Sequence, residues 1–200
     1  GACSMVICLL LCLASVTFGQ ASTTQIEAIA WSPDGQFIAY SSSHGSPLCG
    51  ETDTFVYVIN AVTGALVKTL TAGKCGTHYL NWRADGLRLA GSSYDTFGYR
   101  VWDVESGQVI AVDNLGRQGV GTIRWHPLRN ELAATSSGGG LFLSDAATGV
   151  QIQHNFHTTA SDFDWNPDGS YVVISNIYEG QIYIVNTTTG TVELTMAGHV

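Results

Sequence analysis

The chain has 200 residues, a formal net charge of −8 and only eight lysine and arginine residues, which are scattered along it. The missing basic patch argues against a nucleic-acid partner. High apolar content and low charge exclude a disordered composition, and the many valine, threonine, tyrosine and glycine residues favour strands joined by turns.

The first element is an uncharged leader, "MVICLLLCLASVTF", at residues 5–18. It is short for a bilayer-spanning helix but suits the apolar core of a secretory signal. The small residues of "GQA" (19–21) allow cleavage after Ala21, so we expect residues 1–21 to form a signal peptide and the protein to be exported (secreted, periplasmic or at the cell surface). A retained N-terminal anchor, which would be the protein's sole contact with a membrane, and a buried strand or helix are the alternatives.

Four similar units follow the leader, and each predicts four short strands. The first unit has strands at 25–31, 36–42, 54–60 and 65–70, and the second has them at 77–82, 87–93, 98–103 and 108–113. The third has strands at 120–125, 131–136, 141–145 and 150–155, and the fourth at 161–165, 170–176, 181–186 and 191–196. The segments "SPDG", "RADG" and "NPDG" predict tight turns between first and second strands, with glycine at a positive φ.

Two markers recur in phase with these units. Tryptophan ends the first strand of each unit, at Trp31, Trp82, Trp125 and Trp165. A glycine turn follows the third strand, at Gly64, Gly107, Gly149 and Gly190, with spacings of 43, 42 and 41 residues. Repeats of about this length are typical of propeller blades.

The apolar patterns predict where each strand lies. "TFVYVIN" is apolar on both faces, as a covered strand is, whereas "TVELTM" alternates, as an outer edge strand does. We therefore predict an all-β fold, a β-propeller of four-stranded antiparallel blades. The blades are expected at about 25–70, 77–113, 120–155 and 161–196, and together they form one domain, residues 25–200.

The second unit, "RADGLRLAGSSYDTFGYRVWDVESGQVIAV", resembles a WD40 repeat, with Trp102 and Asp103 at the family's signature position. The likeness extends over residues 25–200, and TolB-like propellers, which "WSPDGQFIAY" fits equally well, are the second choice. WD40 blades often hold a buried network of His, Ser or Thr, Asp and Trp. The resemblance implies partial networks here, listed by unit: Ser93, Asp95 and Trp102, then His157 and Ser175.

Four units are fewer than the seven usual for WD40 propellers, and "AGHV" at the end resembles the start of a fifth. We expect a fragment of a longer propeller, the alternative being an unusually small one. An open set of four blades would leave two blade faces bare.

Cys49 and Cys75 lie in connections that open onto one face of a WD40 blade, so the resemblance permits a disulfide between them in an exported protein. Two free thiols are the alternative. No cofactor is expected.

Asp162 and Asp164 share a face of a predicted inner strand. One such pair supplies too few ligands for a metal site, so we expect no metal and interpret Asp164 as an ion-pair partner of Arg124, which holds the equivalent position in the preceding unit.

No motif of a nucleophile, a phosphate loop or a zinc protease is found, so no catalytic residue is predicted. The resemblance implies a non-catalytic scaffold that binds a protein or peptide through the loops of one face. The candidate contacts are Lys74, Tyr94, Phe97, Arg117, Tyr178 and Glu179. The alternatives are the accessory propeller of a larger exported enzyme or TolB-like periplasmic protein, and a self-associating structural subunit.

Overall fold

A computed structural model of the chain describes residues 25–43, 53–74, 76–93, 98–113, 120–136, 140–153 and 159–198. Within these ranges all regular structure is β-strand. The leader (1–21) and both candidate disulfide cysteines, Cys49 and Cys75, lie outside the described residues.

The described strands form four sheets of four strands each. The first sheet contains β1 (Gln25–Trp31), β2 (Phe37–Ser43), β3 (Thr54–Asn60) and β4 (Leu66–Gly73). The second contains β5 (Thr77–Trp82), β6 (Arg88–Ser93), β7 (Gly98–Asp103) and β8 (Val109–Asp113). The third contains β9 (Val120–Trp125), β10 (Glu131–Ser136), β11 (Leu141–Asp145) and β12 (Gln151–Gln153). The fourth contains β13 (Asp162–Trp165), β14 (Tyr171–Asn176), β15 (Gln181–Asn186) and β16 (Val192–Ala197).

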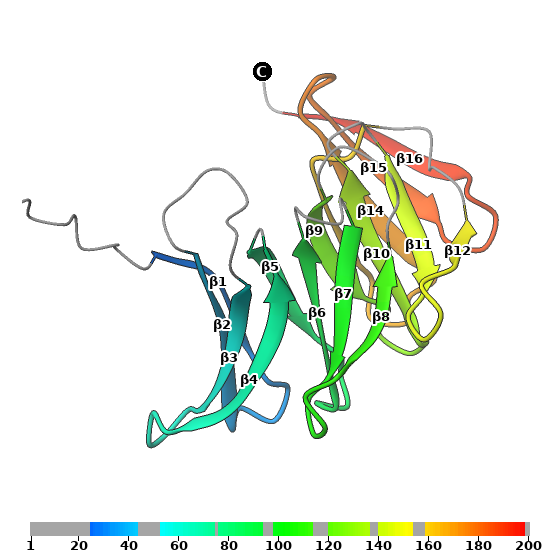
Figure 1. The fold of residues 1–200 in the computed structure, drawn as a ribbon. Helices are drawn as coiled ribbons and strands as arrows, with labels where there is room; N and C mark the ends of the chain where they lie inside the picture. The colour runs from blue at the N-terminus through cyan, green and yellow to red at the C-terminus, as the bar shows by residue number, and fades with distance from the viewer. Residues whose placement is uncertain are drawn as a thin grey trace, which may run out of the picture.

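Each sheet is an antiparallel meander whose strands follow chain order. The first strands of successive sheets contact one another: β1 with β5, β5 with β9 and β9 with β13. Figure 1 shows the four sheets side by side, with β1–β4 at one end of the array and β13–β16 at the other. The predicted β-propeller architecture is confirmed, and we number the sheets as blades 1 to 4, with the first strand of each innermost.

Predicted and observed strands agree closely, and β1 and β3 have the predicted bounds. The clearest difference is β4, which continues to Gly73 instead of ending at residue 70. It does so because Thr54 pairs with Gly73, and the Thr54 hydroxyl donates a 2.7 Å hydrogen bond to the Gly73 carbonyl. At β12 only residues 151–153 of the predicted 150–155 form strand, and residues 154–158 are outside the described ranges.

The turns between first and second strands follow the predicted chemistry. Asp34 Oδ1 accepts hydrogen bonds from the Ser32 hydroxyl at 2.6 Å and the Gln36 amide at 3.0 Å, and Gly35 has a φ of 71°. The equivalent Asp168 accepts from the amide and hydroxyl of Ser170. Short polar side chains thus replace the backbone partners that a tight turn lacks.

The turns between third and fourth strands have one shared cap. The side-chain oxygen of Asn60, Asp103, Asp145 or Asn186 accepts backbone amide hydrogen bonds from residues two or three positions later. Hydrogen bonds favour the charged form, so the Ser106 amide lowers the pKa of Asp103 below the ordinary 3.8, and the Thr148 hydroxyl, followed by the turn amides, does the same for Asp145.

The core lies between blades rather than within one blade. Three buried clusters each combine residues of two consecutive blades. In the first, Val56 and Val58 of blade 1 share a cluster with Trp82 and Leu89 of blade 2. We call the face of a blade that is turned toward the preceding blade its leading face, and the opposite one its trailing face.

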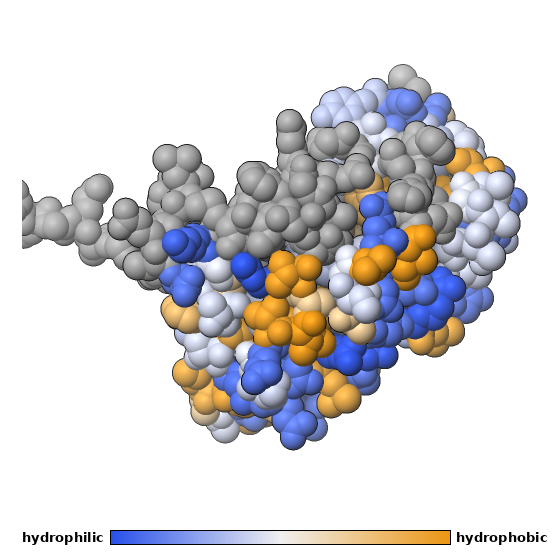
Figure 2. Space-filling model, turned by 45° about the vertical axis from the view of Figure 1, so that its right-hand side comes forward, coloured by the Kyte–Doolittle hydropathy of each residue, from blue (hydrophilic) through white to orange (hydrophobic). Residues whose placement is uncertain are grey.

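Two blade faces have no blade against them among the described residues. On the leading face of blade 1, Ile29 is 67% exposed and Trp31 is 59% exposed. On the trailing face of blade 4, Val173 and Leu194 are exposed. Figure 2 also shows apolar patches (orange) between hydrophilic side chains on one side of the molecule.

Candidate functional site

A pocket of about 290 Å³ lies where the inner strands of blades 2, 3 and 4 end. Three tryptophans, the residues before them and the turns after them line it. The lining residues are Asn81, Trp82, Ala84, Arg124, Trp125, Pro127, Asp164, Trp165, Asn166 and Pro167. Because the same repeat positions from three blades converge here, we call it the axial pocket.

Indole hydrogen bonds fix the wall of the axial pocket. Trp82 Nε1 donates to the carbonyl oxygen of Ala30 at 3.2 Å, across the interface between blades 1 and 2. Trp125 Nε1 makes the equivalent bond to the Asn81 carbonyl at 3.0 Å, and the Trp125 amide donates to Asn81 Oδ1 at 2.8 Å. Each tryptophan therefore ties its inner strand to the preceding inner strand.

Trp165 departs from this pattern. Its Nε1 atom is buried and has no hydrogen-bond partner in the described part of the chain. The ring instead packs edge-on against His126, at 4.8 Å between centroids, and against Phe163, at 6.4 Å. An unpaired buried donor costs free energy, so this position is the weakest link in the indole series.

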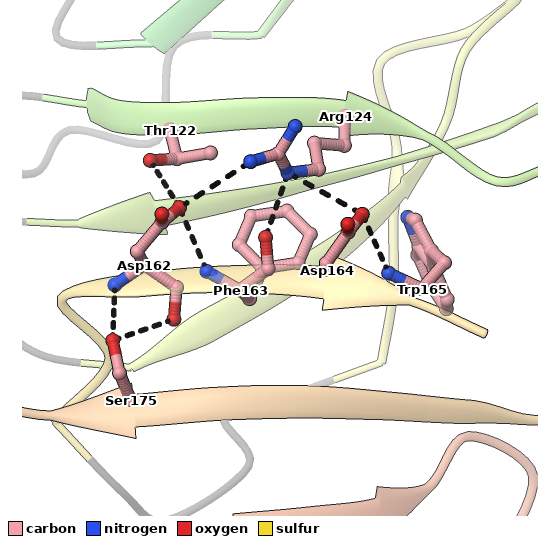
Figure 3. Close-up of polar contacts among 7 residues, drawn as sticks. All are labelled: Thr122, Arg124, Asp162, Phe163, Asp164, Trp165 and Ser175. Carbon is pink, nitrogen blue, oxygen red and sulfur yellow. Dashed lines mark hydrogen bonds and ion pairs between the residues drawn. The ribbon is translucent and has the colours of Figure 1, made fainter. Parts of the chain in front are cut away.

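Arg124 occupies the space between blades 3 and 4 at the edge of the pocket (Figure 3). Its Nε donates to the Phe163 carbonyl at 2.7 Å and lies 3.6 Å from Asp164 Oδ1, while Nη2 lies 3.7 Å from Asp162 Oδ1. Thr122 donates to the same Asp162 oxygen at 2.9 Å. The predicted pairing of Arg124 with Asp164 is confirmed.

The electrostatic part of this cluster is weak. The side chains of Asp162 and Asp164 are 61% and 67% exposed, so water and salt screen their attraction to Arg124. In the described ranges no group of three or more His, Cys, Asp and Glu side chains is placed to hold a metal ion. What the cluster can do is hold Arg124 in place through its hydrogen bond to Phe163 and present the exposed carboxylates of Asp162 and Asp164 to a ligand.

His126 packs against Trp165, one of the residues that line the pocket. Its buried Nδ1 accepts hydrogen bonds from the amides of Leu128 and Arg129, at 3.1 and 3.0 Å. The proton is thereby assigned to Nε2, which faces the Gly169 carbonyl at 3.3 Å. Burial, followed by the charge of Arg129, lowers the pKa of His126 below the ordinary 6.5, so the ring is neutral near pH 7.

Comparison with known proteins agrees with this architecture. The family model for the WD40 domain, or G-beta repeat, matches residues 12–46. The chain thus has the fold of a β-propeller and one segment that matches the WD40 repeat. Among solved structures it is similar to the Cps50 (Swd1) β-propeller domain of Myceliophteria thermophila, with a TM-score of 0.74 and 14% identity over 89% of this chain. No curated protein sequence matches it.

The chain spans 58% of the length of that propeller domain. Four blades that cover little more than half of a propeller are an incomplete propeller, which agrees with the two uncovered faces. At 14% identity, the similarity concerns the fold. No helix in the described ranges is long and apolar enough to cross a membrane.

The predicted binding surface lies at the other end of the blades from the axial pocket. In a four-stranded meander the turns between strands one and two lie opposite the connections between strands two and three. Tyr178, which is 78% exposed, and Glu179 lie in such a connection, where their amides donate to Asn176 Oδ1. Lys74 is exposed after β4.

The other predicted contacts, Tyr94, Phe97 and Arg117, lie outside the described residues. The axial pocket itself was not predicted from the sequence. Its signal was present in the repeat phase, because Asn81, Arg124 and Asp164 all precede a marker tryptophan.

The predicted polar networks are only partly visible. The Trp102 indole donates to the Thr71 carbonyl of blade 1 at 2.9 Å, which joins two blades. Ser175 bonds locally to the main chain of Asp162. Asp95, His157 and the side chain of Ser93 lie outside the described residues, so their place in a network stays a prediction.

Proposed function

We propose that this WD40 chain is a non-catalytic interaction module that binds a peptide segment of a partner protein in the axial pocket. The supporting observation is the convergence of three tryptophans and two prolines with Arg124 and Asp164 in one concave site. WD40 propellers are usually non-catalytic and commonly bind proteins. The half-buried Trp165 and the prolines offer apolar contact area, Trp82 and Trp125 are buried behind it, and the charged groups supply orientation.

The size of the pocket favours a peptide. A volume of about 290 Å³ holds one or two side chains and is near the lower end of the range for small-ligand pockets, about 300–1,000 Å³. A short segment with an apolar side chain beside a polar one would contact both the indole wall and the exposed carboxylate of Asp164.

A library of random twelve-residue peptides displayed on phage tests this function. We expect a consensus sequence whose binding falls at least tenfold in Ala84→Trp, since Ala84 is exposed on the pocket wall and a large side chain there would fill the site. Tyr178→Ala, at the opposite end, is the control and should bind normally. A chain that selects no consensus peptide would refute the proposal.

The surface of Lys74, Tyr178 and Glu179 is the second candidate. Tyr178 and its neighbour Ile177 are 78% and 70% exposed, and aromatic side chains beside a charge suit a protein interface. The same selection separates the two sites: peptides lost in Tyr178→Ala but kept in Ala84→Trp would identify this surface.

Export is proposed as well, on the strength of the uncharged leader and the small residues before Ser22. The matched repeat begins at residue 12, inside the leader, so the N-terminus of the mature protein is informative. N-terminal sequencing of secreted protein should start at Ser22. An intact leader on membrane-bound protein would instead identify an anchor.

A further inference from the structure

The turn that joins β15 to β16 carries a pattern that occurs once in the sequence. Asn186, Thr187 and Thr188 form an Asn-X-Ser/Thr triplet, the acceptor pattern for N-linked glycans. A glycan is bulky and hydrophilic, so the pattern is usable where the asparagine lies at the surface of an exported protein. The geometry of the turn therefore decides whether Asn186 suits this modification.

The two polar atoms of the Asn186 side chain have different surroundings. Oδ1 accepts hydrogen bonds from the amides of Thr188 and Thr189, at 3.0 and 3.1 Å. Nδ2 has no hydrogen-bond partner among the described residues and is not one of their buried, unpaired polar atoms, so it is open to solvent. An N-linked glycan replaces one hydrogen of Nδ2 and leaves Oδ1 an acceptor. The cap of the turn and a glycan are thus compatible.

The other two residues of the triplet divide the remaining work. Thr187 is buried, and its hydroxyl lies within hydrogen-bond distance of the carbonyl oxygens of Gly169 and Ser170, at 2.8 and 3.1 Å. Thr188, the third residue of the triplet, is exposed. The middle residue therefore fixes the turn to the blade, while the acceptor amide and the third residue stay accessible.

The accessibility of this position does not depend on whether another blade follows. Asn60, Asp103 and Asp145 cap the same turn in blades 1 to 3, each of which has a blade after it, and all three are still partly exposed. Blade 4 alone combines an asparagine cap with a threonine two positions later, because Asn60 is followed there by Val62 and an aspartate has no amide nitrogen to modify.

We propose that Asn186 is an N-glycosylation site whose co-substrate is an oligosaccharide joined through C1 of its terminal sugar to a lipid pyrophosphate. Nδ2 forms a bond to C1 and the C1–O bond breaks. The lipid pyrophosphate leaves with the electron pair, and Nδ2 loses one proton to the solvent. In the folded protein the glycan lies in solvent, as its bulk requires. The inference rests on the proposed export, since the donor and its transferase act in a secretory compartment.

Expression in a eukaryotic secretory cell tests the site. The full chain is expressed with its own leader, and also with the signal sequence of a secreted protein added in front of it. We expect the second form to carry one glycan, which peptide N-glycosidase removes, leaving a carboxylate at residue 186 that peptide mass spectrometry locates. Val62→Thr gives the turn of blade 1 the same triplet and is the matched positive control, because Val62 is exposed and Asn60 caps its turn as Asn186 does.

Asn186→Asp should abolish the glycan and keep the turn, since Asp103 and Asp145 cap theirs with the same oxygen. Thr188→Ala should also abolish it, and Thr188→Ser should keep it. A chain that enters the lumen without a glycan at Asn186, or a glycan that persists in Asn186→Asp, would overturn the proposal. A glycan that appears only behind the added signal sequence would support the site and refute export by the chain's own leader, so the two failures are separable.

Discussion

Gly169 lies directly against the imidazole of His126. Its carbonyl oxygen is 3.3 Å from Nε2, and a Cβ added to Gly169 would lie 2.1 Å from ring atoms of His126. The contact joins the turn of blade 4 to the turn of blade 3, next to Pro127 and Pro167 of the axial pocket.

Gly169→Ala should therefore destabilise the protein far more than Gly35→Ala. Both glycines have a φ near +70°, where alanine costs about 1 kcal/mol. A Cβ on Gly35 meets nothing within 4 Å, whereas one on Gly169 displaces His126 and adds an overpacking cost of about 1–3 kcal/mol. Urea unfolding of the two variants measures the difference, and equal losses would show that the His126 contact does not matter.

His126 should make stability depend on pH. Its folded pKa is lowered, so the unfolded chain binds the proton more readily between the folded pKa and the ordinary 6.5. The contribution of neutral His126 to the free energy of unfolding is complete above pH 6.5. It decreases as the pH falls from 6.5 through the folded pKa. We expect His126→Asn to remove this pH-dependent contribution to stability. The turn itself should be kept, since Asn166 accepts a turn amide at the equivalent position in blade 4. Unfolding curves from pH 7.5 to 5 that stay parallel for both proteins would contradict this role.

Asp145 should be replaceable by asparagine but not by alanine. Its Oδ1 accepts from the amides of Ala147 and Thr148, and Asn60 and Asn186 cap their own turns in the same way. Asp145→Ala removes these hydrogen bonds and should cost about 1 kcal/mol in urea unfolding at pH 7. Asp145→Asn should be nearly neutral there.

The same variant isolates the acid sensitivity of this turn. Because the folded pKa of Asp145 is below 3.8, its contribution to stability is present above that pH and is lost as the pH falls through the folded value. Asp145→Asn should therefore lose less stability than the unaltered chain between pH 5 and 3. An identical acid response in both proteins would exclude a role for the cap.

The indole series predicts unequal costs for two similar changes. Trp125→Phe deletes the bond to the Asn81 carbonyl, worth about 1 kcal/mol, in addition to packing. Trp165→Phe deletes a buried N–H without a partner, so it relieves a desolvation cost. We expect Trp165→Phe to be the milder change by about 1 kcal/mol or more. Thermal unfolding compares the two, and a larger loss for Trp165→Phe would reveal a partner for its indole.

The repeat phase determined most of the fold in advance. Strand alternation, the glycine turns and the tryptophan markers are local signals, because each depends on residues a few positions apart. They predicted the four blades and the outer fourth strand, and the repeat phase that they define also predicted the pairing of Arg124 with Asp164 between two blades. The caps at Asn60 and Asp145 belong to the same class, since their partners lie within three residues.

Only the tertiary structure decided how the blades meet. The bond from Trp125 to Asn81 joins residues 44 positions apart, and no local pattern distinguishes it from the unpaired indole of Trp165. The axial pocket arises in the same way, because repeat-equivalent residues approach one another only when successive inner strands are arranged around an axis. The sequence by itself determined the blades through short-range alternation and turn chemistry, whereas long-range packing placed the axial pocket and the indole hydrogen bonds between blades.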